Sequence, residues 1–81
     1  MAQVAYVLMT TKYGKEKEVA QNFMEEELVE DVHILYGQFD IIIKIKAESM
    51  PQIEDFIFNK IRANKDIEET ETLIAADVSS P

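Results

Sequence analysis

The chain repeats one order of secondary-structure patterns, and this repeat limits the folds that it can adopt. Each half contains a β-rich run, then an amphipathic stretch at helical spacing, then a second β-rich run. The halves can be aligned so that Val19 in the first helical stretch matches Ile57 in the second. The predicted order is therefore strand, helix, strand, strand, helix, strand.

Periodicity and breaker residues give the approximate bounds of these elements. Strands are predicted at residues 3–11, 29–36, 39–47 and 68–78, and helices at residues 15–27 and 49–64. Ser49 is expected to cap the second helix, with Pro51 inside the first turn. Gly37 and Gln38 separate the second and third strands, which predicts a hairpin with a Gly-X turn.

This order is typical of the split βαβ, or ferredoxin-like, fold of the α+β class, a four-stranded antiparallel sheet with two helices on one face. A single domain is expected over residues 1–81. The third strand is expected to meet the helices through Ile41, Ile43, Ile45 and Ala47. The apolar stripe of the first helix is predicted to contain Val19, Ala20, Phe23 and Met24.

The sheet face away from the helices is predicted to be apolar and uncovered. We expect it to carry Ala5, Val7, Met9, Leu35, Ile42 and Leu73. An exposed apolar surface of this kind usually marks an interface, and a chain of only 81 residues buries little surface by itself. A homo-oligomer that packs these sheet faces together, with C2 symmetry, is therefore predicted.

Charge and composition exclude several classes of function. Eight Lys and Arg against 16 Asp and Glu give a net charge of -8, which disfavours direct binding to nucleic acid. The absence of Cys excludes disulfides and thiolate chemistry. The apolar runs are far shorter than the roughly 20 residues of a membrane span, and no signal peptide is recognisable. We expect no membrane contact and a cytoplasmic location.

Residues for catalysis or cofactor binding are sparse. Asp31 and His33 share one face of a strand, but two ligands do not make a metal site. With only Gly14 and Gly37 in the chain, no phosphate-binding loop can form. We expect no enzyme activity, no catalytic residue, no metal and no cofactor. Two alternatives stay open, a small dimeric monooxygenase of the antibiotic-biosynthesis type with a cavity near His33, and a purely structural assembly domain.

The turn before the third strand is the most distinctive segment, because Tyr36, Gly37, Phe39 and Asp40 converge there. Structural roles alone account for these residues: a positive φ at Gly37, a turn amide bound by Asp40, and aromatic rings packed over the strand ends. In the last strand, two threonines alternate on one face and can offer hydroxyls to a site: Thr70 and Thr72.

At this turn the sequence resembles the C-terminal effector-binding domain of the Lrp/AsnC (feast/famine) transcription regulators, called RAM for regulation of amino acid metabolism. In that family the turn reads aromatic or Thr, Gly, any residue, Tyr or Phe, then Asp, and the last strand carries Thr-x-Thr. The corresponding segments here are Tyr36-Gly37-Gln38-Phe39-Asp40 and Thr70-Glu71-Thr72. The resemblance covers nearly the whole chain.

The resemblance implies a mode of assembly and a ligand. Dimers of the family join sheet face to sheet face and associate into octamers or other rings, and small effectors, commonly amino acids, bind in clefts between dimers. Asp40 would accept the α-ammonium group, while amides near Gly37 and the Thr hydroxyls would donate to the α-carboxylate. The ligand-binding residues implied by the motifs are Tyr36, Gly37, Phe39, Asp40, Thr70 and Thr72.

Full-length regulators of the family carry a helix-turn-helix domain before this one, whereas the first strand here is predicted to begin at Gln3. The sequence therefore indicates a stand-alone RAM domain without direct DNA binding. Its expected function is effector sensing and oligomerisation, with full-length Lrp/AsnC regulators as partners in mixed assemblies.

Overall fold

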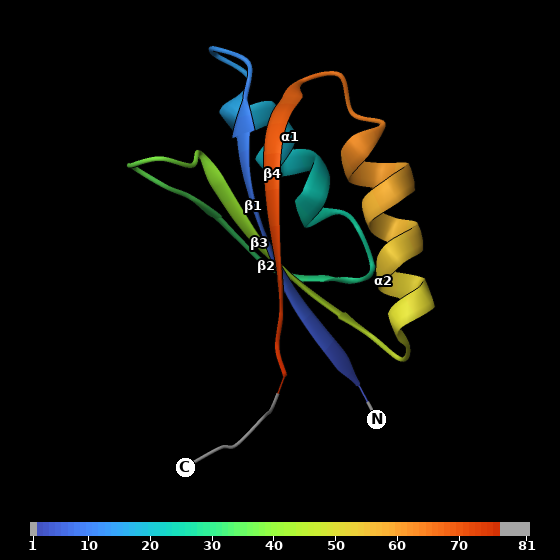
Figure 1. The fold of residues 1–81 in the computed structure, drawn as a ribbon. Helices are drawn as coiled ribbons and strands as arrows, with labels where there is room; N and C mark the ends of the chain where they lie inside the picture. The colour runs from blue at the N-terminus through green and yellow to red at the C-terminus, as the bar shows by residue number, and fades with distance from the viewer. Residues whose placement is uncertain (1, 77–81) are drawn as a thin grey trace.

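A computed structural model describes residues 2–76, which form a four-stranded antiparallel sheet with its helices on one side (Figure 1). The order of strands across the sheet is β2-β3-β1-β4. The ferredoxin-like α+β fold is therefore confirmed. Along the chain the elements are β1 (Gln3–Thr11), α1 (Glu16–Met24), β2 (Val29–Ile34), β3 (Ile41–Ala47), α2 (Met50–Phe56), the π-helical segment η1 (Ile57–Arg62), and β4 (Ile67–Ile74).

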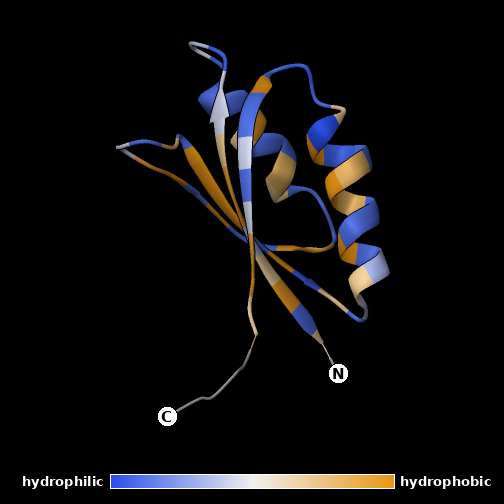
Figure 2. Cartoon of the chain, viewed as in Figure 1, coloured by the Kyte–Doolittle hydropathy of each residue, from blue (hydrophilic) through white to orange (hydrophobic). Residues whose placement is uncertain are grey.

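The core lies between the two central strands and the helices. The register pairs fully buried residues of β1 with fully buried residues of β3: Ala5 with Ile45, Val7 with Ile43, and Met9 with Ile41. Figure 2 shows the hydrophobic run that begins β3. The helices cover this layer, and the ring centroids of Phe23 and Phe56 lie 6.2 Å apart. Helix packing over β1 and β3 therefore provides most of the apolar burial.

The prediction for the uncovered sheet face is wrong for Ala5, Val7 and Met9, which lie in the core. Successive residues of a strand alternate between faces, and both sets of β1 are apolar, so the pattern alone does not distinguish them. The other set of β1, which includes Tyr6 and Leu8, faces away from the helices. These residues lie beside Ile42 and Leu73, which are on the open face as predicted. We define the open face as the side that carries Val4, Tyr6, Leu8, His33, Ile42, Lys44, Glu71 and Leu73.

Several element boundaries differ from the prediction. β2 ends at Ile34 and β3 begins at Ile41, so residues 35–40, Leu35 included, form the connection instead of a Gly-X turn. α1 ends at Met24, and the side chain of this terminal residue is 68% exposed rather than part of the apolar stripe. β4 ends at Ile74, and its predicted continuation past residue 76 lies outside the described residues.

The second helix begins at the predicted position, but the predicted capping hydrogen bond does not form. Ser49 occupies the N-cap position, with proline in the first turn, yet its side chain makes no capping hydrogen bond. The side-chain Oε1 of Gln52 accepts a hydrogen bond from the amide of Glu48 at 2.8 Å. None of the helices within residues 2–76 is long and apolar enough to cross a membrane.

The second helix changes from α to π geometry after Phe56. In a regular α-helix, at about 100° per residue, Lys60 would lie on the inner face with Ile53, and Ile61 would be turned about 80° away. The wider turns of η1, with i→i+5 bonds, return Ile61 to the inner face, where it is fully buried. Lys60 is exposed, and its Nζ lies 3.6 Å from Oε2 of Glu26. The prediction of one regular helix is therefore incomplete.

Candidate functional site

Asp40 fixes the hairpin of residues 35–40 to the end of β1. Its Oδ2 accepts a hydrogen bond from the amide of Thr11 at 2.9 Å, and its own amide donates to the carbonyl of Met9 at 2.9 Å. Its carbonyl accepts from the amide of Leu35 at 2.8 Å. The prediction that the Asp40 carboxylate binds a backbone amide is therefore confirmed. The amide belongs to Thr11 of β1, however, and not to the turn.

The tip of the hairpin is presented to solvent. Gly37 has a φ of +133°, as predicted, and this is a conformation that L-residues rarely adopt. Phe39 is half-buried, whereas Tyr36 is fully exposed. The expectation that both rings pack over the strand ends is therefore wrong for Tyr36. Its ring remains available for another molecule.

Thr70 and Thr72 lie on β4, on the side of the sheet that faces the helices. They pair with Met9 and Val7 of β1, whose side chains are buried on that side. Both threonines are nevertheless exposed, because β4 is an edge strand that the helices do not cover. Ile41, Met9 and Thr70 form a row across three strands, so the backbones of β3 and β4 are about 10 Å apart there.

The structure therefore brings the predicted site residues to one end of the sheet without enclosing them in one cavity. Asp40 lies at the edge of β1 that faces β3, where its carboxylate binds the amide of Thr11. Thr70 lies on β4, which pairs with the opposite edge of β1. Tyr36 is directed to solvent. A single chain thus offers two separate groups of ligand-binding candidates at a common edge.

Thr11 lies between these two groups and was not predicted. Its amide binds Asp40, its backbone pairs with Ile67, and its side chain is buried. Within residues 2–76 its hydroxyl has no hydrogen-bond partner, although buried hydroxyls usually have one. Nothing in the sequence distinguishes this threonine from an ordinary strand residue.

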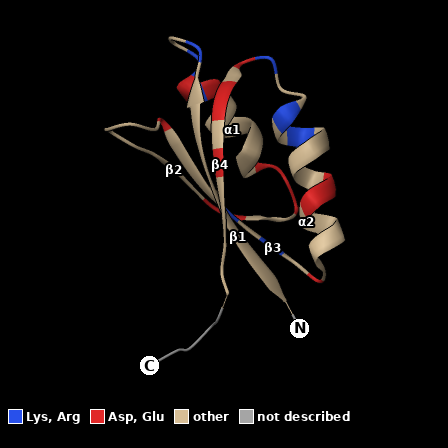
Figure 3. Ribbon diagram, in the orientation of Figure 1, with Lys and Arg blue, Asp and Glu red and all other residues tan. Residues whose placement is uncertain are grey.

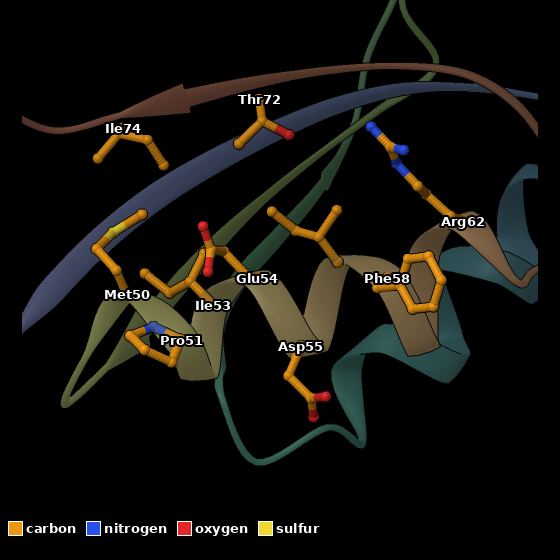
Figure 4. A pocket seen from close by; sticks show the side chains of 10 residues that line it. Met50, Pro51, Ile53, Glu54, Asp55, Phe58, Arg62, Thr72 and Ile74 are labelled. Carbon is orange, nitrogen blue, oxygen red and sulfur yellow. The ribbon is translucent and has the colours of Figure 1, made fainter.

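A groove of about 740 Å³ lies between the second helix and β4 (Figure 4). Thr72 is the predicted site residue that lines it, beside Glu54 and Arg62. Sequence analysis missed these two charged residues, although Arg62 is the only arginine of the chain. Apolar side chains form most of the remaining wall: Met50, Ile53, Ile57 and Ile74.

A smaller cavity of about 170 Å³ lies beside His33 on the open face. Its lining includes Tyr6, Asp31 and Lys44. The monooxygenase alternative requires a closed apolar cavity within one protomer, and this charged hollow does not meet that requirement. Among residues 2–76, no three His, Asp or Glu side chains are grouped as metal ligands.

Together these features define a class, a small α+β domain with an exposed hairpin and an exposed edge strand. The family model described as the Lrp/AsnC ligand binding domain matches residues 4–79. The chain therefore belongs to the Lrp/AsnC ligand-binding domain family, as the sequence motifs predicted.

Individual relatives agree with this assignment. The HTH-type transcriptional regulator FL11 of Pyrococcus abyssi is 29% identical over 73 residues, which cover 90% of this chain and 48% of that protein. The hypothetical protein PHS023 from Pyrococcus horikoshii has a crystal structure with a TM-score of 0.88 and 35% identity, covering 93% of this chain and 89% of that one. The crystal structure of FFRP-DM1 has a TM-score of 0.88 and 34% identity, covering 90% and 97%.

The chain thus spans about half the length of the curated relatives that it matches. These relatives are named as HTH-type transcriptional regulators. The two solved chains are matched over most of their own length.

Proposed function

We propose that the chain is an oligomeric sensor of an amino acid or a similar small effector, and that ligand binding changes its assembly. The observation that carries this proposal is the hairpin, where Asp40 is held by the backbone of β1 while Tyr36 stays exposed. A fixed carboxylate beside a free aromatic ring suits recognition of an α-ammonium group and a side chain. The description of the family as a ligand binding domain supports the same function.

The proposed ligand site is completed by a neighbouring dimer. One chain leaves the hairpin tip open to solvent, so a ligand bound there would be covered on one side only. Packing of a second dimer against this end of the sheet would enclose it, as ligand sites generally require. Asp40 binds the ammonium group, amides near Gly37 and the hydroxyls of Thr70 and Thr72 bind the carboxylate, and the rings of Tyr36 and Phe39 contact the side chain.

The proposed dimer forms through the open face. Tyr6 is 36% exposed and Leu73 is 47% exposed, and both lie on this face beside Leu8 and Ile42. A two-fold axis would pack this patch against its copy and cover it. Further association gives a ring of dimers, with an octamer as the expected form.

Direct contact with DNA is not part of the proposal. The net charge is -8, and acidic side chains are spread over β4, both helices and the connection after α1 (Figure 3). Phosphate binding requires a concentration of positive charge. Any effect on transcription would therefore act through mixed assembly with full-length Lrp/AsnC regulators, whose equilibrium the ligand shifts.

Isothermal titration calorimetry against the proteinogenic amino acids tests the binding. At least one should bind, and Asp40→Asn should weaken it about tenfold, because the variant removes the charge that pairs with the ammonium group. Glu27→Gln, at an exposed residue in the connection after α1, is the matched control and should bind normally. If no amino acid binds and the oligomer distribution never responds, the proposed function is wrong.

A further inference from the structure

The groove between the second helix and β4 combines apolar walls with three charged residues: Glu54, Asp55 and Arg62. Ile53 forms part of its base, and Ile74 on β4 remains 44% exposed. Figure 4 shows that Glu54 extends from α2 towards β4 and that Arg62 extends towards the same strand from the end of η1, whereas Asp55 points away. Thr72 lies on the β4 side of the groove between them.

Within the described part of the chain, no ion pair neutralises Glu54 or Arg62. Among residues 2–76, ion pairs form at other positions, for example between Lys60 and Glu26 on the other side of the second helix, but neither Glu54 nor Arg62 takes part in one. An unpaired carboxylate and an unpaired guanidinium in one apolar groove are complementary to a zwitterion that carries an apolar group.

We infer that this groove is a second ligand site, which binds an α-amino acid with an apolar side chain. Arg62 and the hydroxyl of Thr72 bind the α-carboxylate, and Glu54 binds the α-ammonium group. The side chain of the ligand packs against Met50 and Ile74, which are both partly accessible. The volume of about 740 Å³ lies within the range of roughly 300–1,000 Å³ that small-ligand pockets occupy.

This site is distinct from the one proposed at the hairpin. β1 separates β4 from the hairpin, because the order across the sheet is β2-β3-β1-β4. Only Thr72 belongs to both groups of residues. The groove is also formed within a single chain, so its binding does not depend on a neighbouring dimer. It therefore goes beyond the proposed function and adds a preference for apolar amino acids.

Calorimetric titration of the full chain with L-leucine tests the inference. Arg62→Gln and Glu54→Gln should each raise the dissociation constant about tenfold, because each removes one charge-assisted contact. Lys65→Gln and Glu27→Gln, at exposed residues that do not line the groove, are the matched controls, and each should leave the constant unchanged. The 2-oxo acid of leucine, which lacks the ammonium group, and isopentylamine, which lacks the carboxylate, should both bind more weakly than leucine.

The outcomes separate this inference from the proposed function. If leucine binding is lost in Asp40→Asn but unchanged in Arg62→Gln and Glu54→Gln, the groove is not a site while the hairpin function stands. Failure of leucine to bind at millimolar concentration overturns the groove site even if another amino acid binds at the hairpin. If Arg62→Gln alters the sedimentation coefficient but not leucine binding, the groove is a contact between copies, and the inference is wrong.

Discussion

Asp40 joins two strands through the same carboxylate that is proposed to bind the ligand. Oδ2 is engaged by the amide of Thr11 at 2.9 Å, and a carboxylate has a second oxygen that can accept from an ammonium group. The hydrogen bond to β1 fixes the direction of that second oxygen. At the scale of single residues, structural and binding roles are therefore combined rather than separate.

Replacement of Asp40 should separate these roles. Asp40→Ala removes the acceptor of a partly buried amide and should lower the free energy of unfolding by about 1–2 kcal/mol. Asp40→Asn keeps an acceptor oxygen but loses its charge, and should lower the free energy of unfolding by only about 0.5 kcal/mol. Urea unfolding at a fixed protein concentration measures both. Equal losses in the two variants would contradict the proposed hydrogen-bonding role.

Thr10 and Thr11 are adjacent but should respond oppositely to the same substitution. The hydroxyl of Thr11 is buried without a partner among residues 2–76, so Thr11→Val should raise the free energy of unfolding by about 1 kcal/mol. The hydroxyl of Thr10 accepts a hydrogen bond from the amide of Glu69 at 3.0 Å, so Thr10→Val should lower it by about 0.5–1 kcal/mol. Urea midpoints of the two variants that shift in the same direction would refute this account.

The residues of the hairpin were more predictable than those of the groove. The positive φ at Gly37 and the backbone contact of Asp40 follow from local turn chemistry, which the sequence contains. In the sequence, Glu54 and Arg62 look like ordinary charged residues on a solvated helix face. Their place in the groove depends on how β4 lies against the helix, which the sequence does not show. The unsatisfied hydroxyl of Thr11 likewise arises from packing and leaves no local pattern.

At the scale of elements, the second helix and β1 show where periodicity is insufficient. Both alternate sets of β1 are apolar, so only its register with β3 reveals which set is buried. In the second helix, a regular α-helix would place Lys60 on the inner face. A charged residue on the apolar face would be unfavourable, and the seven-residue spacing from Ile53 implies it. Only the structure shows that the π-helical turns of η1 remove Lys60 from that face.

The π-helical geometry makes a specific prediction about stability. Ile61 is fully buried and Ile57 only partly, so Ile61→Ala should lower the free energy of unfolding by about 3–4 kcal/mol and Ile57→Ala by about 1–2 kcal/mol. A regular helix would turn Ile61 farther from the core than Ile57 and reverse this order. Chemical unfolding of the two variants decides between these geometries.

At the scale of the whole molecule, the sheet is covered on one side only. The helices bury one face of β1 and β3, while the open face keeps Tyr6 and Leu73 partly exposed. β4 is an edge strand with both hydroxyl-bearing candidates exposed on its helix side. The proposed dimer face and the proposed ligand-binding residues thus lie on different sides of the sheet, so a ligand would act on assembly through the contact between dimers rather than through the dimer face.

A charge placed on the open face should disrupt the proposed dimer. Leu73→Asp should shift the protein towards monomers of 9.3 kDa, because a carboxylate in an apolar interface loses its hydration without a partner. Met24→Asp is the matched control, since Met24 is 68% exposed at the end of α1, away from this face. Size-exclusion chromatography with light scattering that shows equal masses for both variants and the parent would argue against the sheet-face dimer.

The proposed sensor changes its assembly when it binds an amino acid. Sedimentation velocity at micromolar protein, with and without the amino acid that binds most tightly by calorimetry, tests it most directly. We expect a multimer in the absence of ligand and a shifted distribution of oligomers at saturating ligand, with the shift reduced in Asp40→Asn. A chain that sediments as a 9.3 kDa monomer in both conditions would contradict the account.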